Sequence, residues 1–353
     1  MKKSAFKAAT MLYFASAYFG QAAAANGPDP LFADNDILTA RLVAPFRQIM
    51  NERPDSKEHE VPGLFSFVNA DGAQVNFQVK LLTRGNNRRK PEVCSFAPLR
   101  LNFKKRDVED TLFHKQDKLK LVTHCINKRE FYRQAVMREY LAYRVLNVVT
   151  DFSFRVRLLR MSYVFSDDED KEEVTYAFLI ESKERLAKRL DMDKQSQNSV
   201  HLEQLDREHT NLVSVFQYFI GNVDFSPVKG RPGKPCCHNY ALFSPDGENF
   251  WSIPYDFDLT GLVEPPHVIL NPKFRQSSIR QRIYRGRCYN NEFIPASLQK
   301  FRDSRPEIEA VIAGVTELSD RHRKRVDSYV KSVYKLLDNE DKLIKKFEKA
   351  CIG

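Results

Sequence analysis

The spacing of apolar residues is mainly typical of strands in the first half of this chain of 353 residues and mainly typical of helices in the second, which limits the folds it can adopt. Between residues 63 and 181, short runs alternate apolar and polar side chains, which is typical of half-buried strands. From residue 202 onward, apolar residues recur every three or four positions, which is typical of helices. The pattern predicts an α+β protein of two lobes, a sheet first and a mainly helical part second.

The individual elements follow from the same spacing. The first part contains predicted antiparallel strands over 63–69, 75–82, 98–103, 118–122, 154–165 and 174–180. It also contains one predicted helix over 130–149, where Tyr132, Val136 and Tyr140 share a face. The second part contains a predicted helix over 202–220, a small β-hairpin formed by 240–243 and 250–254, and charged helices from 296 to the end. We therefore expect an N-lobe over 63–182 and a C-lobe over 183–353.

The segment before the sheet has two parts. Residues 1–25 have the order of a secretory signal peptide, with Lys2, Lys3 and Lys7, then an apolar run, then small residues and cleavage near Ala24 or Ala25. A membrane anchor is the alternative, but the apolar run is shorter than the ~20 residues of a spanning helix. We expect a secreted or periplasmic protein, with no membrane partner after cleavage. Residues 26–62 form an N-terminal extension in which 36–50 has helical spacing.

Six cysteines remain after the signal peptide is removed. An even number in an exported chain favours disulfides, and six cysteines allow 15 pairings. Cys236 and Cys237 are adjacent, so we expect one of them to bond a distant cysteine rather than its neighbour. The alternative is a metal site at Cys236, Cys237 and His238, but the spacing is not that of a zinc site.

The charge of the chain has a simple interpretation. The formal net charge is +10, and the loss of three leader lysines leaves +7. Acidic residues interrupt the basic ones, as at Lys183, Glu184 and Arg185, and no basic and aromatic stripe is present. This is typical of a solvated surface, so we do not expect a nucleic-acid partner.

Acidic and amide side chains gather around the predicted hairpin of the second part. Asp224 follows the 202–220 helix, Asn239 precedes the first hairpin strand, and Asp256 and Asp258 follow the second. Carboxylate and amide oxygens are the ligands that Mg²⁺ and Mn²⁺ prefer. A phosphoryl-transfer site needs one Asp to orient the acceptor hydroxyl and further oxygens to hold a metal on the phosphates. For any one of these Asp residues, a cap or turn is an equally good interpretation.

Five motifs, in order, resemble those of the spore-coat kinases (CotH-like), a family of secreted, atypical protein-kinase-like enzymes. They are Thr83-Arg84-Gly85-Asn86, the strand 98–103, Met137-Arg138-Glu139-Tyr140-Leu141-Ala142-Tyr143, Phe178-Leu179-Ile180-Glu181, and the set of Asp224, Asn239 and Tyr255-Asp256-Phe257-Asp258. The resemblance covers about residues 75–265. It implies a bilobal protein-kinase-like fold.

The resemblance also implies a role for each matched residue. Asp224 is the catalytic Asp, Asn239 and Asp256 are metal ligands, and Asp258 is a supporting or second metal ligand. Arg84 and Asn86 lie near the phosphates of ATP and Glu181 lies near the adenine. Glu139 is the helix partner of a phosphate-binding lysine.

The chain departs from the family pattern at several places. The usual lysines after the R-G-N motif are absent from 91–95, and position 102 is Asn, so the phosphate-binding lysine is among Lys104, Lys118 and Lys120. We favour Lys120, because apolar neighbours place it on a strand. Tyr255 stands where Trp is usual. Residues 228–237 are inserted between Asp224 and Asn239, and we expect a disulfide to hold this loop.

These observations lead to three hypotheses for function. The first is a secreted kinase that transfers the ATP γ-phosphate to protein hydroxyls with Mg²⁺ or Mn²⁺. The second is a catalytically weak pseudokinase or nucleotide-binding adaptor, because the lysines are missing and the loop is long. The third is a metal-dependent glycosyltransferase, because Asp256-x-Asp258 is also a D-x-D motif; the lack of an alternating βα pattern argues against it.

Overall fold

The computed structural model describes residues 28–53, 59–169 and 171–353, so the predicted signal peptide lies outside the described residues. Within these residues, seven strands close into a barrel in the order β1-β2-β3-β4-β5-β7-β6. The strands are β1 (Leu38–Ala44), β2 (Val61–Val68), β3 (Gln74–Thr83), β4 (Leu99–Phe103), β5 (Lys118–Val122), β6 (Val156–Phe165) and β7 (Lys171–Ile180). All neighbours are antiparallel except β1 and β6, which are parallel.

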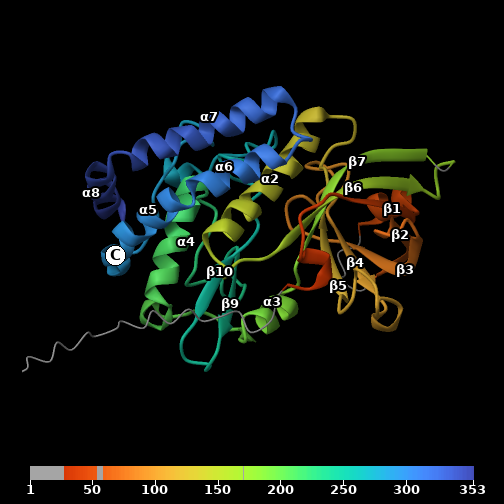
Figure 1. Cartoon of the computed structure of the whole chain (residues 1–353), viewed down its shortest axis with the longest axis horizontal. Coiled ribbons are helices and arrows are strands. Elements are labelled where there is room, and N and C mark those ends of the chain that lie inside the picture. Colours follow the sequence, from red (N-terminus) through yellow and green to blue (C-terminus); the bar gives the residue numbers. More distant parts are fainter. Residues whose placement is uncertain (1–27, 54–58, 170) are drawn as a thin grey trace, which may run out of the picture.

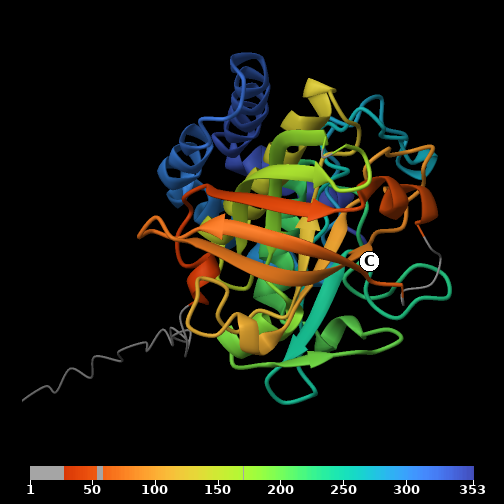
Figure 2. The ribbon, with the colours of Figure 1, turned by 90° about the vertical axis from the view of Figure 1, so that its right-hand side faces the viewer.

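The predicted bilobal protein-kinase-like fold is wrong, because the sheet is a closed barrel of mixed strand direction. The closing strand β1 lies in the segment 36–50 that was predicted to be helical, and only α1 (Phe46–Glu52) is a helix there. Leu38, Ala40 and Leu42 alternate with more exposed residues and face the core. The extension 26–62 therefore supplies the strand that closes the barrel (Figure 2).

The interior of the barrel is filled with aromatic rings. Phe113 lies in the connection between β4 and β5, and its ring centroid is 5.1 to 5.6 Å from those of Phe65, Phe67, Phe77 and Phe103. All five residues are buried. Such close packing makes the barrel interior a hydrophobic core and places any ligand outside it.

Helices cover one side of the barrel (Figure 1). Helix α2 (Glu130–Val149) joins β5 to β6, packs on β6 and β7, and contacts α6 on its other side. The remaining helices are α3 (Lys183–Arg189), α4 (Arg207–Ile220), α5 (Ile294–Asp303), α6 (Arg305–Gly314), α7 (Asp320–Leu337) and α8 (Glu340–Ala350). Among the described residues, every helix is too short or too polar to cross a bilayer.

A second, small sheet lies beneath α2 and α4. Strands β9 (Tyr240–Ser244) and β10 (Trp251–Pro254) form the predicted hairpin, and β8 (Asp193–Gln195) adds a third strand in the order β10-β9-β8. Tyr143 of α2 packs against Phe257, which follows β10, and Phe257 packs against Phe216 of α4. This shared core fixes the end of the hairpin against α2.

All six cysteines form disulfides. Cys94 pairs with Cys125, Cys288 with Cys351, and Cys236 with Cys237. The prediction that Cys236 or Cys237 bonds a distant partner is therefore wrong, because the other four cysteines pair among themselves. The Cys94 bond ties the β3–β4 connection to the end of β5, and the Cys288 bond ties the C-terminus to the helical part.

Candidate functional site

A cavity of about 420 Å³ opens where the end of β3, strand β5, helix α2 and the β9–β10 hairpin meet. Eight of the nine residues predicted from the sequence line it, namely Arg84, Asn86, Lys120, Glu139, Asp224, Asn239, Asp256 and Asp258. They come from segments more than 170 residues apart in the chain. The cavity is therefore the candidate active site.

The phosphate-side residues follow the end of β3. Gly85 has a φ of +93°, a conformation that glycine adopts without a steric penalty. The backbone N–H of Arg84 donates to the carbonyl oxygen of Pro98, 2.8 Å away, so the turn is held against the start of β4. The positive φ at position 85 explains why a glycine lies between the two cavity residues Arg84 and Asn86.

The two ends of the hairpin place Asn239 and Asp256 side by side. The N–H of Tyr255 donates to the carbonyl oxygen of Asn239 at 2.9 Å. Asn239 and Asp256 both have left-handed backbone conformations, with φ of 58° and 67°. Asn and Asp tolerate this region best among residues other than glycine, and residues held in it cluster at functional sites.

Helix α2 presents Glu139 and Tyr143 to the cavity, one helical turn apart. The N–H of Asp256 donates to the Tyr143 hydroxyl oxygen at 2.9 Å, so α2 holds the backbone of a predicted metal ligand. Glu139 is 3% exposed. Its burial raises its pKa to about 8, and the charges of Asp258 and Asp256 act in the same direction.

Glu139 pairs with an arginine that the sequence analysis did not single out. Its Oε2 atom lies 3.4 Å from Nη1 of Arg88, whose other terminal nitrogen donates to the carbonyl oxygen of Thr123. The predicted ion pair with a phosphate-binding lysine is therefore replaced by a pair with Arg88. Arg88 lies in the basic run 84–90, so the sequence indicates that a basic side chain is available near the cavity. The spacing within this run does not indicate which arginine contacts Glu139.

Lys120 lies on β5 with its ammonium nitrogen 4.6 Å from the centre of the Tyr255 ring. The ammonium of Lys183 lies 5.1 Å from the same ring, a cation–π geometry in both cases. Burial, together with the positive charges of Arg84 and Lys183, lowers the pKa of Lys120 to about 7. An anionic ligand would reverse this effect, because it stabilises the charged ammonium.

The carboxylates of Asp256 and Asp258 repel one another. Burial, together with the negative charge of Asp256, raises the pKa of Asp258 to about 7. A divalent cation would relieve the repulsion, so the donor set fits Mg²⁺ or Mn²⁺. No group of three or more His, Cys, Asp or Glu side chains able to hold a metal occurs in the described part of the chain. A divalent cation beside Asp256, Asp258 and Asn239 would therefore need the phosphates of a substrate as further ligands, as Mg²⁺ commonly does.

Asp224 accepts hydrogen bonds from several side chains. Its Oδ2 atom accepts from Nη2 of Arg231 at 3.1 Å and from Nδ2 of Asn239 at 3.2 Å. Its Oδ1 atom lies 2.8 Å from Nε2 of His238. Burial alone would raise the pKa of Asp224, but the His238 hydrogen bond and the nearby positive charges hold it below its usual value. Asp224 is thus an ionised group suited to orienting a hydroxyl.

The loop 228–237, inserted between Asp224 and Asn239, forms part of the cavity wall. Arg231, Cys236 and Cys237 line the cavity from this loop, and His238 follows it. Nε2 of His238 also lies 3.2 Å from Nε of Arg231, so the same nitrogen faces a donor on Arg231 and an acceptor on Asp224. The ring can satisfy only one of them at a time. The loop keeps Asp224 and Asn239 within hydrogen-bonding distance without the predicted long-range disulfide.

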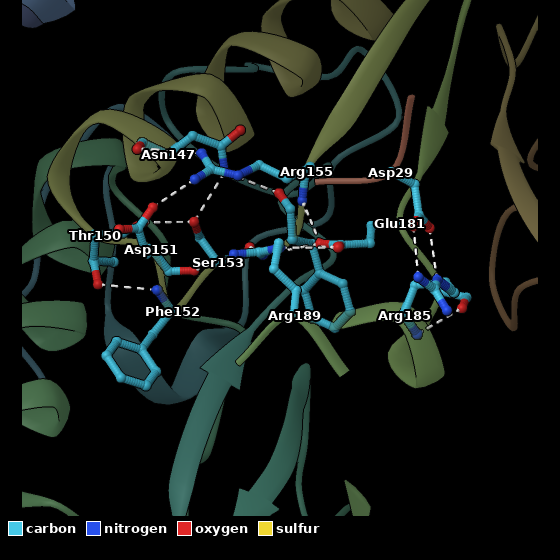
Figure 3. Close-up of polar contacts among 12 residues, drawn as sticks. Asp29, Asn147, Thr150, Asp151, Phe152, Ser153, Arg155, Glu181, Arg185 and Arg189 are labelled. Carbon is cyan, nitrogen blue, oxygen red and sulfur yellow. Dashed lines mark hydrogen bonds and ion pairs between the residues drawn. The ribbon is translucent and has the colours of Figure 1, made fainter. Parts of the chain in front are cut away.

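Glu181 lies outside the cavity lining, and its carboxylate is occupied elsewhere (Figure 3). Nε and Nη2 of Arg189 donate to its two oxygens, each at 3.0 Å, and the N–H of Arg155 donates to Oε2 at 3.0 Å. Both Glu181 and Arg189 are 4% exposed. The Glu181 carboxylate thus anchors the connection from β7 to α3, and the place of Glu181 near the adenine stays a prediction.

Comparisons of the chain with protein families, with curated proteins and with solved structures gave no match. The resemblance to the spore-coat kinases stays a prediction that rests on the five sequence motifs. The chemistry of the cavity must therefore be argued from its own residues.

Proposed function

We propose that this chain is a secreted phosphotransferase that moves the γ-phosphate of ATP to hydroxyl groups of proteins, with Mg²⁺ or Mn²⁺ as cofactor. One observation carries the proposal: a single cavity brings Arg84 and Lys120 together with the acidic pair Asp256 and Asp258 and with Asp224. In such a site, the cations Arg84 and Lys120 would bind phosphate oxygens, Asp256 and Asp258 would bind a metal ion, and Asp224 would accept a hydrogen bond from the acceptor hydroxyl.

Each group has a distinct task in this proposal. Lys120 and Arg84 neutralise the charge of the phosphates, and Arg88 supplies a further positive charge beside Glu139. Asp256, Asp258 and the amide oxygen of Asn239 would hold the divalent cation. That cation supplies further charge neutralisation on the phosphates and fixes their orientation.

Asp224 acts on the acceptor. Its carboxylate accepts a hydrogen bond from the attacking hydroxyl and orients it toward the γ-phosphorus. A bond forms between the hydroxyl oxygen and the γ-phosphorus, the bond from that phosphorus to the β–γ bridging oxygen breaks, and ADP leaves. The proton of the hydroxyl passes to the Asp224 carboxylate.

The disulfide bonds of the chain are compatible with export. Three disulfides join all six cysteines, and disulfides persist in oxidising compartments. This is compatible with an extracellular or periplasmic location, as the predicted signal peptide implies.

A second candidate is a protein that binds the nucleotide and transfers phosphate weakly or not at all. The contacts of Asp224 favour it, because Arg231, Asn239 and His238 all compete with an acceptor hydroxyl for the carboxylate. Calorimetry with ATP and Mn²⁺, followed by a transfer assay with radiolabelled ATP, separates the two. Binding without transfer supports the second candidate.

The metal assignment is tested by Asp256→Ala. We expect transfer to fall at least about a hundredfold, because the phosphates lose their metal. Glu248→Ala is the matched control, since Glu248 is an exposed acid in the turn at the other end of the same hairpin. Full activity in the purified Asp256→Ala protein would refute the assignment.

A further inference from the structure

A second cavity, of about 350 Å³, adjoins the first on the far side of Asp224. The residues that line both cavities are Asn86, Asn87, Asp224, Arg231 and Leu259. Asp224 therefore stands at the boundary between the two spaces. A molecule in the second cavity would meet the proposed nucleotide across this carboxylate.

The wall of the second cavity is largely apolar. It is formed by Val223, Val268, Ile269, Leu270, Phe274 and Ile279. Ile269 is 90% exposed, whereas the other exposed large apolar residues in the described part of the chain are 37% to 51% exposed. Ile269 does not stand alone, because Val268 and Leu270 line the cavity beside it, and a contiguous exposed apolar surface marks an interaction site.

The charged residues of this cavity favour an acidic ligand. Lys90 and Arg231 are its basic lining residues, and Asp224 is its acidic one. Arg231 and Asp224 form an ion pair, so their charges largely offset each other and Lys90 leaves the cavity with a net positive charge. A ligand that carries a carboxylate is favoured over a basic one by this charge.

The apolar wall is joined to the Asp224 loop by Arg285. Nη1 of Arg285 donates to the carbonyl oxygens of Val223 and Phe225, at 2.5 and 2.9 Å. Its guanidinium lies 4.7 Å from the ring centres of both Phe225 and Phe274. A ligand on this wall is thus held at a fixed position relative to Asp224, as transfer between two bound reactants requires.

We propose that the second cavity binds the acceptor, a peptide segment in which the hydroxyl residue is next to an apolar side chain and near an acidic one. The apolar side chain covers Ile269, the acidic one meets Lys90 or Arg231, and the hydroxyl reaches Asp224. The transfer step is the one described above. This inference rests on the proposed phosphotransferase function and adds the class of its substrate.

The test uses the full mature chain with a library of serine peptides that vary the neighbours of the serine. The best sequence is then compared with a partner in which glycine replaces its apolar neighbour. We expect the apolar peptide to have a KM at least about tenfold lower than the glycine peptide, and we expect Ile269→Asp to remove this difference. Ile269→Leu should retain it. Leu336→Asp, an exposed apolar position on α7, is the matched control.

The outcomes separate the inference from the proposed function. Calorimetry with ATP and Mn²⁺ and hydrolysis of ATP by water do not need the second cavity. If ATP binds and is hydrolysed but the peptides show no apolar preference, or Ile269→Asp leaves their KM unchanged, the acceptor class is wrong. If ATP neither binds nor is hydrolysed, the proposed function itself fails.

Discussion

Replacement of Lys120 by methionine should make the ligand-free protein more stable while weakening its binding of nucleotide. The Lys120 ammonium lies over the Tyr255 ring, near the positive charges of Arg84 and Lys183. Methionine keeps most of the length of the side chain and removes the charge. The cavity should therefore lose an unfavourable charge in the absence of ligand and a favourable one in its presence.

The magnitude follows from the pKa of the lysine. Burial and the neighbouring charges lower the pKa of Lys120 from 10.5 to about 7. One pKa unit corresponds to about 1.4 kcal/mol, so the folded state is destabilised by at most about 4 kcal/mol at pH 7. Lys120 is partly exposed and solvent screens part of its charge, so we expect Lys120→Met to raise the free energy of unfolding by about 1–2 kcal/mol.

The pH dependence of the stability gain shows whether removal of the lysine charge causes it. Below pH 7 the lysine is charged in both states, so the full cost is present. Above pH 10.5 it is neutral in both states, and the cost is absent. The stability gained by Lys120→Met should therefore be largest at pH 7 and below and should shrink steadily as the pH rises toward 10.5. A gain that came only from better apolar packing would stay constant.

Urea unfolding at pH 6, 7, 8 and 9, with EDTA and without nucleotide, measures this difference. Calorimetry with ATP and Mn²⁺ measures the binding, which should weaken at least about tenfold. Lys118→Met is the matched control, because Lys118 is two positions earlier on β5 and is exposed. A Lys120→Met protein that is less stable than wild type, or a gain that does not change with pH, would refute the reasoning.

Two further substitutions test the supports of the site. Tyr143→Phe removes the hydroxyl that accepts a hydrogen bond from the Asp256 N–H. We expect the free energy of unfolding to fall by about 1–2 kcal/mol and Mn²⁺-dependent nucleotide binding to weaken. Unchanged binding would show that Asp256 does not need this hydrogen bond. Glu181→Gln leaves Arg189 without its buried counter-charge and should lower the free energy of unfolding by about 3–5 kcal/mol in urea titrations. Because Glu181 lies outside the cavity, nucleotide affinity of the folded variant should match wild type, and a large loss would instead favour a place at the adenine.

Much of the candidate site was predictable from the sequence. Asp224, Asn239 and Asp256 could be found because each follows or precedes a recognisable element, and the ends of a hairpin must lie close together. Lys120 was predicted from its apolar neighbours on a strand. These inferences are local, since each depends on a single helix end, strand or hairpin, and the two hairpin ends Asn239 and Asp256 are 17 positions apart.

The barrel could not be predicted, because its closure depends on contacts distant in sequence. Strand β1 has alanine at two of its inward positions, so its alternation of apolar and polar residues is weak, and helical spacing competes with it. It is a strand because it pairs with β2 on one side and with β6 on the other, where Leu42 matches Tyr163. The corrected fold class follows from these two pairings, which close the barrel.

Partner choice among charged residues also required the tertiary structure. The sequence analysis offered Lys104, Lys118 and Lys120 as candidate partners of Glu139, whereas the structure pairs Glu139 with Arg88. In the same way, the motif of Glu181 predicts a ligand-binding residue, but in the structure the Glu181 carboxylate accepts hydrogen bonds from Arg189. A motif says which side chain is present, and only packing says which neighbour it meets.

The sequence by itself therefore determined the secondary structure around the cavity, the even set of cysteines and the types of chemical group available. The tertiary structure decided that the sheet closes, that Cys236 pairs with Cys237, and that eight of nine predicted residues share one cavity. The physical reason is that periodicity and turn chemistry act over a few residues. Burial, charge pairing and strand closure depend on groups that folding brings together from distant parts of the chain.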